Sequence, residues 1–163
     1  MTETPPFSLS RESRIVIDRD GHFWHEGQRI EHERLAQALA RWVAVDDATG
    51  RYILRNDREW CFVTVEDAPL AVRVFSPSAQ GATLTLSDGT NEALDPATLR
   101  IDPADVPYCN VRQGTLPARF SRRAALALLE SAQVLDGRVV VLVGGRKRVL
   151  PRVAADVAGR RPG

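Results

Sequence analysis

The fold is decided by the stretch from residue 14 to residue 54, RIVIDRDGHFWHEGQRIEHERLAQALARWVAVDDATGRYIL. Its first part alternates around Ile15 and Ile17, which predicts a strand, and Asp20-Gly21 predicts the turn before a return strand. Its middle predicts a helix over residues 32–43, because apolar residues recur there at helical spacing. These residues are Leu35, Ala38, Leu39, Trp42 and Val43. A second strand pair follows, with strands at residues 51–54 and 60–65.

The second half of the chain repeats this order of elements. Strands are predicted over Tyr108–Arg112 and Leu116–Phe120, then a helix over residues 122–134 with Ser121 as its N-cap, then a hairpin over residues 138–150. We therefore predict an α+β fold built by internal duplication of a unit made of a strand pair, a helix and a strand pair. In this duplication the two predicted helices correspond. Because the halves share little sequence identity, a chance similarity of element order is the alternative.

Four segments are predicted along the chain. Residues 1–12 are polar with adjacent prolines and are predicted to form a flexible arm. Residues 13–66 are predicted to form an N-terminal α+β domain, and residues 67–150 a strand-rich C-terminal domain with additional antiparallel strands. Residues 151–163 form a tail rich in Arg and Ala, for which a short helix and a frayed end are both compatible with the sequence.

The composition is that of a folded soluble protein. Of 163 residues, 44% are hydrophobic and 26% are charged, which excludes wholesale disorder. The longest apolar runs, Ala124–Leu129 and Val139–Val143, are far shorter than the roughly 18 residues of a membrane span. No secretory signal is visible at the N-terminus, and two cysteines are too few for a disulfide scaffold. We therefore expect a cytoplasmic protein with no membrane partner; the sequence carries no signal for an oligomeric state.

Charge is distributed unevenly along the chain. Residues 1–111 carry 11 Arg and Lys residues against 18 Asp and Glu residues, whereas residues 112–163 carry 11 against 3. Such asymmetry favours an anionic partner at the C-terminal half. Electrostatic attraction between the two halves across an interface is the alternative explanation.

Motifs for metal binding or catalysis are absent from the sequence. A metal site formed by His22, His25, His32 and Glu26 is not expected. His22 and His25, three apart on a strand, point to opposite faces, and His32 lies beyond a turn. Cys61 and Cys109 each lie inside an apolar strand, where cysteine is usually a core residue. No phosphate-binding loop, dinucleotide fingerprint or nucleophile elbow occurs. We therefore expect neither a metal nor a cofactor, and no enzymatic activity.

Two charged motifs remain as candidate binding sites. Glu66 and Asp67 lie side by side between a strand and Pro69, where they could accept hydrogen bonds from a ribose or a base, or form a solvated linker. Three arginines, at positions Arg119, Arg122 and Arg123, cluster near the start of the predicted second helix, where positive charge opposes the helix dipole. These arginines would bind an anion there or pair with the acidic first half.

Three sequence stretches resemble a bacterial family known as domain of unknown function 1285 (DUF1285). The matching stretches are IDRDGHFWHEG at residues 17–27, VEDAP at residues 65–69 and PYCNVRQG at residues 107–114. With both predicted helices, the resemblance covers about residues 14–150. It implies a duplicated two-domain α+β protein whose second domain is superficially similar to pleckstrin-homology folds. It also implies a nucleotide-like ligand bound at the domain interface and a role in signalling, with no enzymatic activity established.

The resemblance also implies a set of ligand-binding residues. Matched by motif, they are Glu66, Asp67, Tyr108 and Arg112, with Asn91 added from the turn before it. The chain departs from the family at residues 55–60 and at Leu70, which leaves the identity of the ligand open. Alternation along the strand predicts that Tyr108 and Arg112 project together toward Glu66 and Asp67.

The leading hypothesis is therefore a non-enzymatic protein that binds a small anionic, nucleotide-like ligand between its two domains. An aromatic ring, a cation and two carboxylates suit a base, a phosphate and a ribose. One alternative is a nucleic-acid-binding module that uses the basic C-terminal half, although few aromatic residues there could stack on bases, which makes nucleic acid the weaker interpretation. The other alternative is a protein-interaction adaptor.

Overall fold

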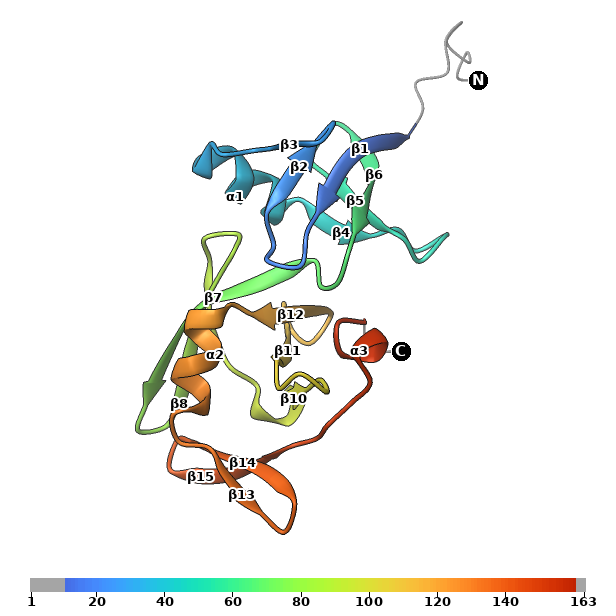
Figure 1. The fold of residues 1–163 in the computed structure, drawn as a ribbon. Helices are drawn as coiled ribbons and strands as arrows, with labels where there is room; N and C mark the ends of the chain where they lie inside the picture. The colour runs from blue at the N-terminus through green and yellow to red at the C-terminus, as the bar shows by residue number, and fades with distance from the viewer. Residues whose placement is uncertain (1–10, 161–163) are drawn as a thin grey trace, which may run out of the picture.

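The computed structural model describes residues 11–160 (Figure 1). The first part of the chain forms β1 (Glu12–Ile17), β2 (Phe23–His25), β3 (Gln28–Arg29), α1 (Glu33–Arg41), β4 (Val43–Val45), β5 (Tyr52–Arg55) and β6 (Trp60–Val65). The middle forms β7 (Leu70–Ser78), β8 (Gly81–Leu86), β9 (Asn91–Ala93), the 3-10 helix η1 (Pro96–Thr98), β10 (Arg100–Ile101), β11 (Pro107–Val111) and β12 (Leu116–Phe120). The last part forms α2 (Arg122–Leu129), β13 (Gln133–Leu135), β14 (Arg138–Val143), β15 (Arg146–Leu150) and α3 (Ala155–Ala158).

The first six strands form one mixed sheet. Their order is β3-β2-β1-β6-β5-β4, so two three-stranded meanders meet at a central parallel pair, β1 and β6. Helix α1 carries the chain from β3 at one edge to β4 at the other. The first ten residues of the predicted arm over residues 1–12 lie outside the described part of the chain. Glu12, which is also part of the predicted arm, belongs to β1.

The next six strands repeat this layout. Their order is β10-β11-β12-β7-β8-β9, again with a central parallel pair, here β7 and β12. In each sheet the chain runs outward through three strands, crosses by a helical segment and returns inward through three more. The molecule is thus mostly β with few helices, and its two six-stranded sheets of similar layout fit two similar domains. The expected boundary after residue 66 falls in the connection between β6 and β7.

The predicted correspondence between the two long helices is wrong. By position in the sheet, the counterpart of α1 is the short η1, because each segment joins the two outer strands of its own sheet. Helix α2 instead follows the last strand of the second sheet and leads into a separate three-stranded sheet, β13-β14-β15. The two helices share an apolar stripe because each packs one face against the core, a requirement that many unrelated helices meet.

Helices α1 and α2 each begin at a side-chain cap, whereas α3 has none. The backbone N–H of Leu35 donates to His32 Nδ1 at 3.3 Å, and that of Ala124 donates to Ser121 Oγ at 3.2 Å. Each helix ends before its predicted end, since Val43 already lies in β4 and Gln133 in β13.

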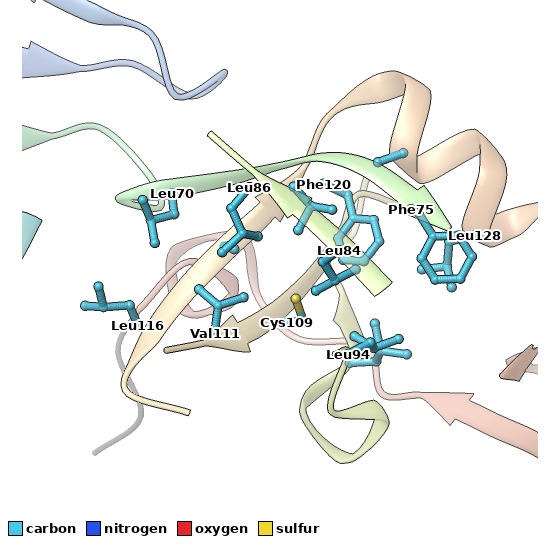
Figure 2. Close-up of a cluster of buried hydrophobic side chains, with 14 of the residues drawn as sticks. Leu70, Phe75, Leu84, Leu86, Leu94, Cys109, Val111, Leu116, Phe120 and Leu128 are labelled. Atoms are coloured by element: carbon cyan, nitrogen blue, oxygen red, sulfur yellow. The ribbon is translucent and has the colours of Figure 1, made fainter. Parts of the chain in front are cut away.

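The strands of the second sheet enclose most of the core of the second domain, and α2 packs against one end of it. Figure 2 shows Phe75 of β7 beside Leu128 of α2, with Phe120 of β12 and Leu84 of β8 next to them. The rings of Phe75 and Phe120 have centroids 6.3 Å apart, and Leu84 is completely buried. Among residues 11–160, no helix has the length and apolar character needed to cross a bilayer.

The two sheets approach each other closely at Gly21, in the turn between β1 and β2. Gly21 has φ of +78°, and a Cβ atom there would lie 2.9 Å from Cβ of Ala71 on β7. Only a residue without a side chain therefore fits between the turn and β7. Gly27 has nearly the same conformation, with φ of +79°, and no atom lies within 4 Å of a Cβ built on it.

These two glycines allow the contact between the sheets to be measured. Gly27→Ala should lower the free energy of unfolding by about 1 kcal/mol, from the unfavourable left-handed backbone alone. Gly21→Ala should cost about 1–3 kcal/mol more, because the added methyl group also presses on Ala71. Urea unfolding measures both variants, and equal losses would contradict a close contact between the sheets.

Candidate functional site

Arg112 fastens the two domains together rather than lining a ligand site. It follows the end of β11 with φ of +51°, so its side chain leaves the alternation of the strand. Its guanidinium donates to the carbonyl oxygens of Val43 at 2.6 Å and Ala40 at 2.8 Å, and to Asp88 Oδ2 at 3.0 Å. The prediction that Arg112 projects with Tyr108 toward Glu66 and Asp67 is therefore wrong.

Asp88 is the buried partner of this arginine. It lies in the turn between β8 and β9 with a side chain that is 2% exposed, and its Oδ1 also accepts from the N–H and hydroxyl of Thr90. Burial alone would raise the pKa of Asp88, but the hydrogen bonds from Thr90 and Arg112 outweigh it and hold the pKa below its usual value. Arg41 of α1 reaches the backbone oxygen of Asp88 at 3.2 Å from the other domain.

A second polar cluster contains Asp67, Tyr108 and Arg119. The hydroxyl of Tyr108 donates to Asp67 Oδ2 at 2.5 Å, and Arg119 donates to the same oxygen at 3.0 Å. Tyr108 is 1% exposed, and burial together with the carboxylate raises its pKa well above the usual value. The end of α3 closes over the cluster, since a Cβ atom at Gly159 would overlap Asp67. Asp67 and Tyr108 are thus neighbours, as predicted, but they are bonded to each other.

The remaining predicted site residues are dispersed. Glu66 is exposed beside Asp67. Asn91 starts β9, where its side-chain oxygen accepts from the Thr85 hydroxyl at 2.7 Å. Arg122 and Arg123 are exposed in the first turn of α2, whereas Arg119 turns inward to Asp67. The structure therefore brings together Glu66, Asp67, Tyr108 and Arg119, and places Arg112, Asn91, Arg122 and Arg123 elsewhere.

Two clefts are lined by residues of both the first domain and a later part of the chain. The first, which we call the interdomain cleft, has a volume of about 660 Å³ and lies between the β1–β2 turn, the start of α1 and strands β7 and β8. The second, the C-terminal cleft, has a volume of about 740 Å³ and is lined by Glu66, Asp67 and residues of α3. Both volumes are typical of small-molecule sites.

Charged side chains of both signs line the interdomain cleft. Its walls include Arg29 and His22 from the first domain and Arg73 from β7, together with Glu31 and Glu33. Burial lowers the pKa of His22, and the guanidinium groups of Arg73 and Arg29 lower it further. Burial also lowers the pKa of Arg73, which donates to the carbonyl oxygen of Asp20 at 2.8 Å. An anion in this cleft would reduce the repulsion between the two guanidinium groups of Arg29 and Arg73.

A group of possible metal ligands, Asp18, Asp20 and His22, lies at the edge of this cleft with ligand atoms within 4.8 Å of one another. The carboxylate of Asp18 is already engaged. It accepts from the backbone N–H groups of Asp20 and His22, each at 2.9 Å, and from Trp24 Nε1 at 2.8 Å. These hydrogen bonds stabilise the β1–β2 turn. This structural role accounts for the orientation of the Asp18 carboxylate without a metal ion.

The fold is similar to that of solved DUF1285 proteins. One, from Silicibacter pomeroyi DSS-3, is 20% identical, with a TM-score of 0.67, and the match covers 86% of this chain and 81% of that protein. Another, from Shewanella baltica OS155, is 22% identical, with a TM-score of 0.60, and the match covers 74% of this chain and 94% of that protein. The chain matches no family profile and no curated protein at the sequence level. The resemblance to DUF1285 proteins predicted from the sequence is confirmed.

Sequence reasoning missed the cationic residues of the interdomain cleft. Arg73 interrupts the apolar strand Leu70–Phe75, and a charge inside such a strand is a signal that could have been followed. Arg29 lies in the two-residue strand β3, within a polar part of the sequence. A charged residue is ordinary there and gives no comparable signal.

Removal of either partner of the pair formed by Arg112 and Asp88 should be strongly destabilising. We expect Arg112→Met or Asp88→Asn to lower the free energy of unfolding by about 3–5 kcal/mol, because each leaves a buried polar group without its partner. A double-mutant cycle in urea should show a large coupling energy. The matched control is the exposed pair Arg51 and Glu12, at 2.7 Å, where a much smaller loss is expected because water solvates either group when its partner is removed. Equal effects at the two pairs would contradict the assigned role.

The same pair predicts a dependence of stability on pH. The pKa of Asp88 is lower in the folded protein than the unfolded value of about 3.9, so its contribution is present above that pH and is lost as the pH falls through the folded pKa. The difference in unfolding free energy between the wild type and Asp88→Asn should therefore shrink below about pH 4. Chemical denaturation at several pH values measures this, and a constant difference would contradict it.

Proposed function

We propose that the protein binds a small anionic ligand in the interdomain cleft without catalysing a reaction. The observation that carries this proposal is the convergence of His22, Arg29 and Arg73, from both domains, on one cleft of about 660 Å³. Guanidinium groups bind phosphate and carboxylate groups through paired hydrogen bonds. A ligand at the domain interface is also expected from the sequence, but with other residues in the ligand site.

The other walls of the cleft suit a ligand that also carries hydroxyl groups. Glu31 and Glu33 can accept hydrogen bonds from hydroxyls, and Gln37 of α1 can both donate and accept. A phosphorylated sugar, as in a nucleotide, combines these features. We therefore propose a nucleotide-like ligand whose phosphate contacts Arg29 and Arg73.

A signalling role is part of this proposal. A ligand that contacts both domains would stabilise one arrangement of the domains. A second protein that binds this arrangement would then respond to the presence of the ligand. The internal duplication and the pleckstrin-homology-like form of the second domain stay predictions beside it. Superposing β1–β6 on β7–β12 would test the duplication, and superposing the second domain on a pleckstrin-homology domain would test its form.

The proposal is tested with nucleoside monophosphates and ribose 5-phosphate as probes, by calorimetric titration. Arg29→Gln should weaken binding of the best probe by about tenfold or more, because one charge-assisted contact is lost. The matched control is Arg34→Gln, which removes the same charge from α1 outside the cleft lining and should leave binding within about twofold. Equal weakening by both variants, or no saturable binding of any probe, would refute the proposal.

A further inference from the structure

A second, separate concentration of positive charge lies on the third sheet. The sheet β13-β14-β15 continues from α2, and one face of it packs onto the core of the second domain. In the register of β14 and β15, Arg146 lies opposite Val143 and Arg148 opposite Val141. Because directly opposed residues share a face of the sheet, both arginines are on the side of these buried valines. Lys147, opposite the exposed Leu142, is on the other face.

A cleft of about 530 Å³ is present where these two arginines emerge. Its remaining walls are the tip of the β7–β8 hairpin, with Gln80, and an apolar floor that includes Leu94, Pro96 and Val143. None of the described residues that line it is acidic. Asp95, between two lining residues, accepts from the backbone N–H of Ala97 at 3.1 Å and caps η1. We call this the basic cleft.

The two hairpins that form the basic cleft are held close together. Gly144, at the tip of the β14–β15 hairpin, has φ of +59°, and a Cβ atom there would lie 2.7 Å from the carbonyl carbon of Gln80. In Figure 1 the tip of the β14–β15 hairpin and the end of the β7–β8 hairpin lie near each other at the lower left. The cleft is thus built between two packed turns rather than on a loose loop.

Among the described residues, neither arginine side chain makes a polar contact that stabilises the fold. The side chains of Arg146 and Arg148 make no hydrogen bond or ion pair with another residue in the range 11–160, and the Nε atom of Arg148 is buried without a partner. A buried donor of this kind costs free energy unless something accepts its hydrogen bond. By contrast, Arg112, Arg119 and Arg152 of the same half are each paired.

We propose that the basic cleft binds the phosphate group of a small phosphomonoester. Two guanidinium groups present enough donors for the terminal oxygens of one phosphate and balance its two negative charges. The Gln80 amide can donate a further hydrogen bond, and the floor formed by Leu94 and Pro96 suits an apolar or aromatic body of the ligand. This site is distinct from the interdomain cleft and does not depend on the function proposed there.

Phenyl phosphate is the probe, because it joins a phosphate to an apolar ring, and calorimetric titration of the full chain is the measurement. Arg148→Gln and Arg146→Gln should each weaken its binding by about tenfold or more. Lys147→Gln removes the same charge from the same strand but from the opposite face, and it should change binding by less than about twofold. Arg29→Gln, in the interdomain cleft, should also leave binding of phenyl phosphate to this site unchanged.

The fold of each variant is checked by its thermal unfolding. Arg148→Met should unfold at or above the wild-type temperature, since it removes a donor that has no partner in the fold. Arg148→Lys keeps the charge without the planar fork and should bind more weakly than the wild type, which separates recognition from general attraction.

Three outcomes would overturn the proposal. The first is the absence of saturable binding by the wild type, and the second is a loss in Lys147→Gln as large as that in Arg148→Gln. The third is that a short single-stranded oligonucleotide binds far more tightly than phenyl phosphate, with a steep dependence on salt, which would indicate a nucleic-acid surface instead.

Discussion

The arrangement of the two domains depends on one guanidinium group. Arg112 of the second domain donates to Ala40 O and Val43 O, at the place where α1 ends and edge strand β4 begins. A helix C-terminus and the outer side of an edge strand both leave carbonyl groups that need donors. Arg112 supplies those donors from the other domain, and Asp88 fixes the orientation of the fork. The first domain therefore completes its own hydrogen bonding only in contact with the second.

A second line of contact determines what space remains between the domains. The β1–β2 turn approaches β7 at Gly21 and Ala71, and Arg73 joins the same turn through the carbonyl of Asp20. With α1 clamped by Arg112 and the turn seated on β7, the surfaces between these contacts cannot close. The interdomain cleft is thus a consequence of how the domains are joined. Arg73 both helps to hold the turn and supplies part of the positive charge of the cleft.

Local patterns in the sequence predicted the elements but not their pairing. Alternation and turn residues located most strands, and helical spacing located α1 and α2. The parallel pairs β1–β6 and β7–β12 join strands far apart in the chain, and no local pattern encodes such a partner. The apolar stripe of α2 therefore led to the wrong equivalence. At the site, alternation correctly placed Tyr108 near Asp67, because both lie in or beside regular strands. It failed for Arg112, because a backbone with φ of +51° ends the alternation one residue earlier than the sequence suggested.

The uneven charge of the chain has a specific consequence in this fold. Three ion pairs join the acidic part of the chain, residues 1–111, to the basic part, residues 112–163: Arg112 with Asp88, Arg119 with Asp67, and Arg152 with Asp105. Among residues 11–160, however, no ion pair joins residues 13–66 to the later part of the chain. The polar contacts between the domains are instead made by Arg41, Arg73 and Arg112, each of which donates to a backbone carbonyl of the other domain. Carbonyl groups satisfy the donors of an arginine without neutralising its charge. The acidic part thus neutralises three arginines of the C-terminal part, whereas Arg146 and Arg148 form no ion pair among the described residues and lie at the wall of a cleft that no acidic described side chain lines.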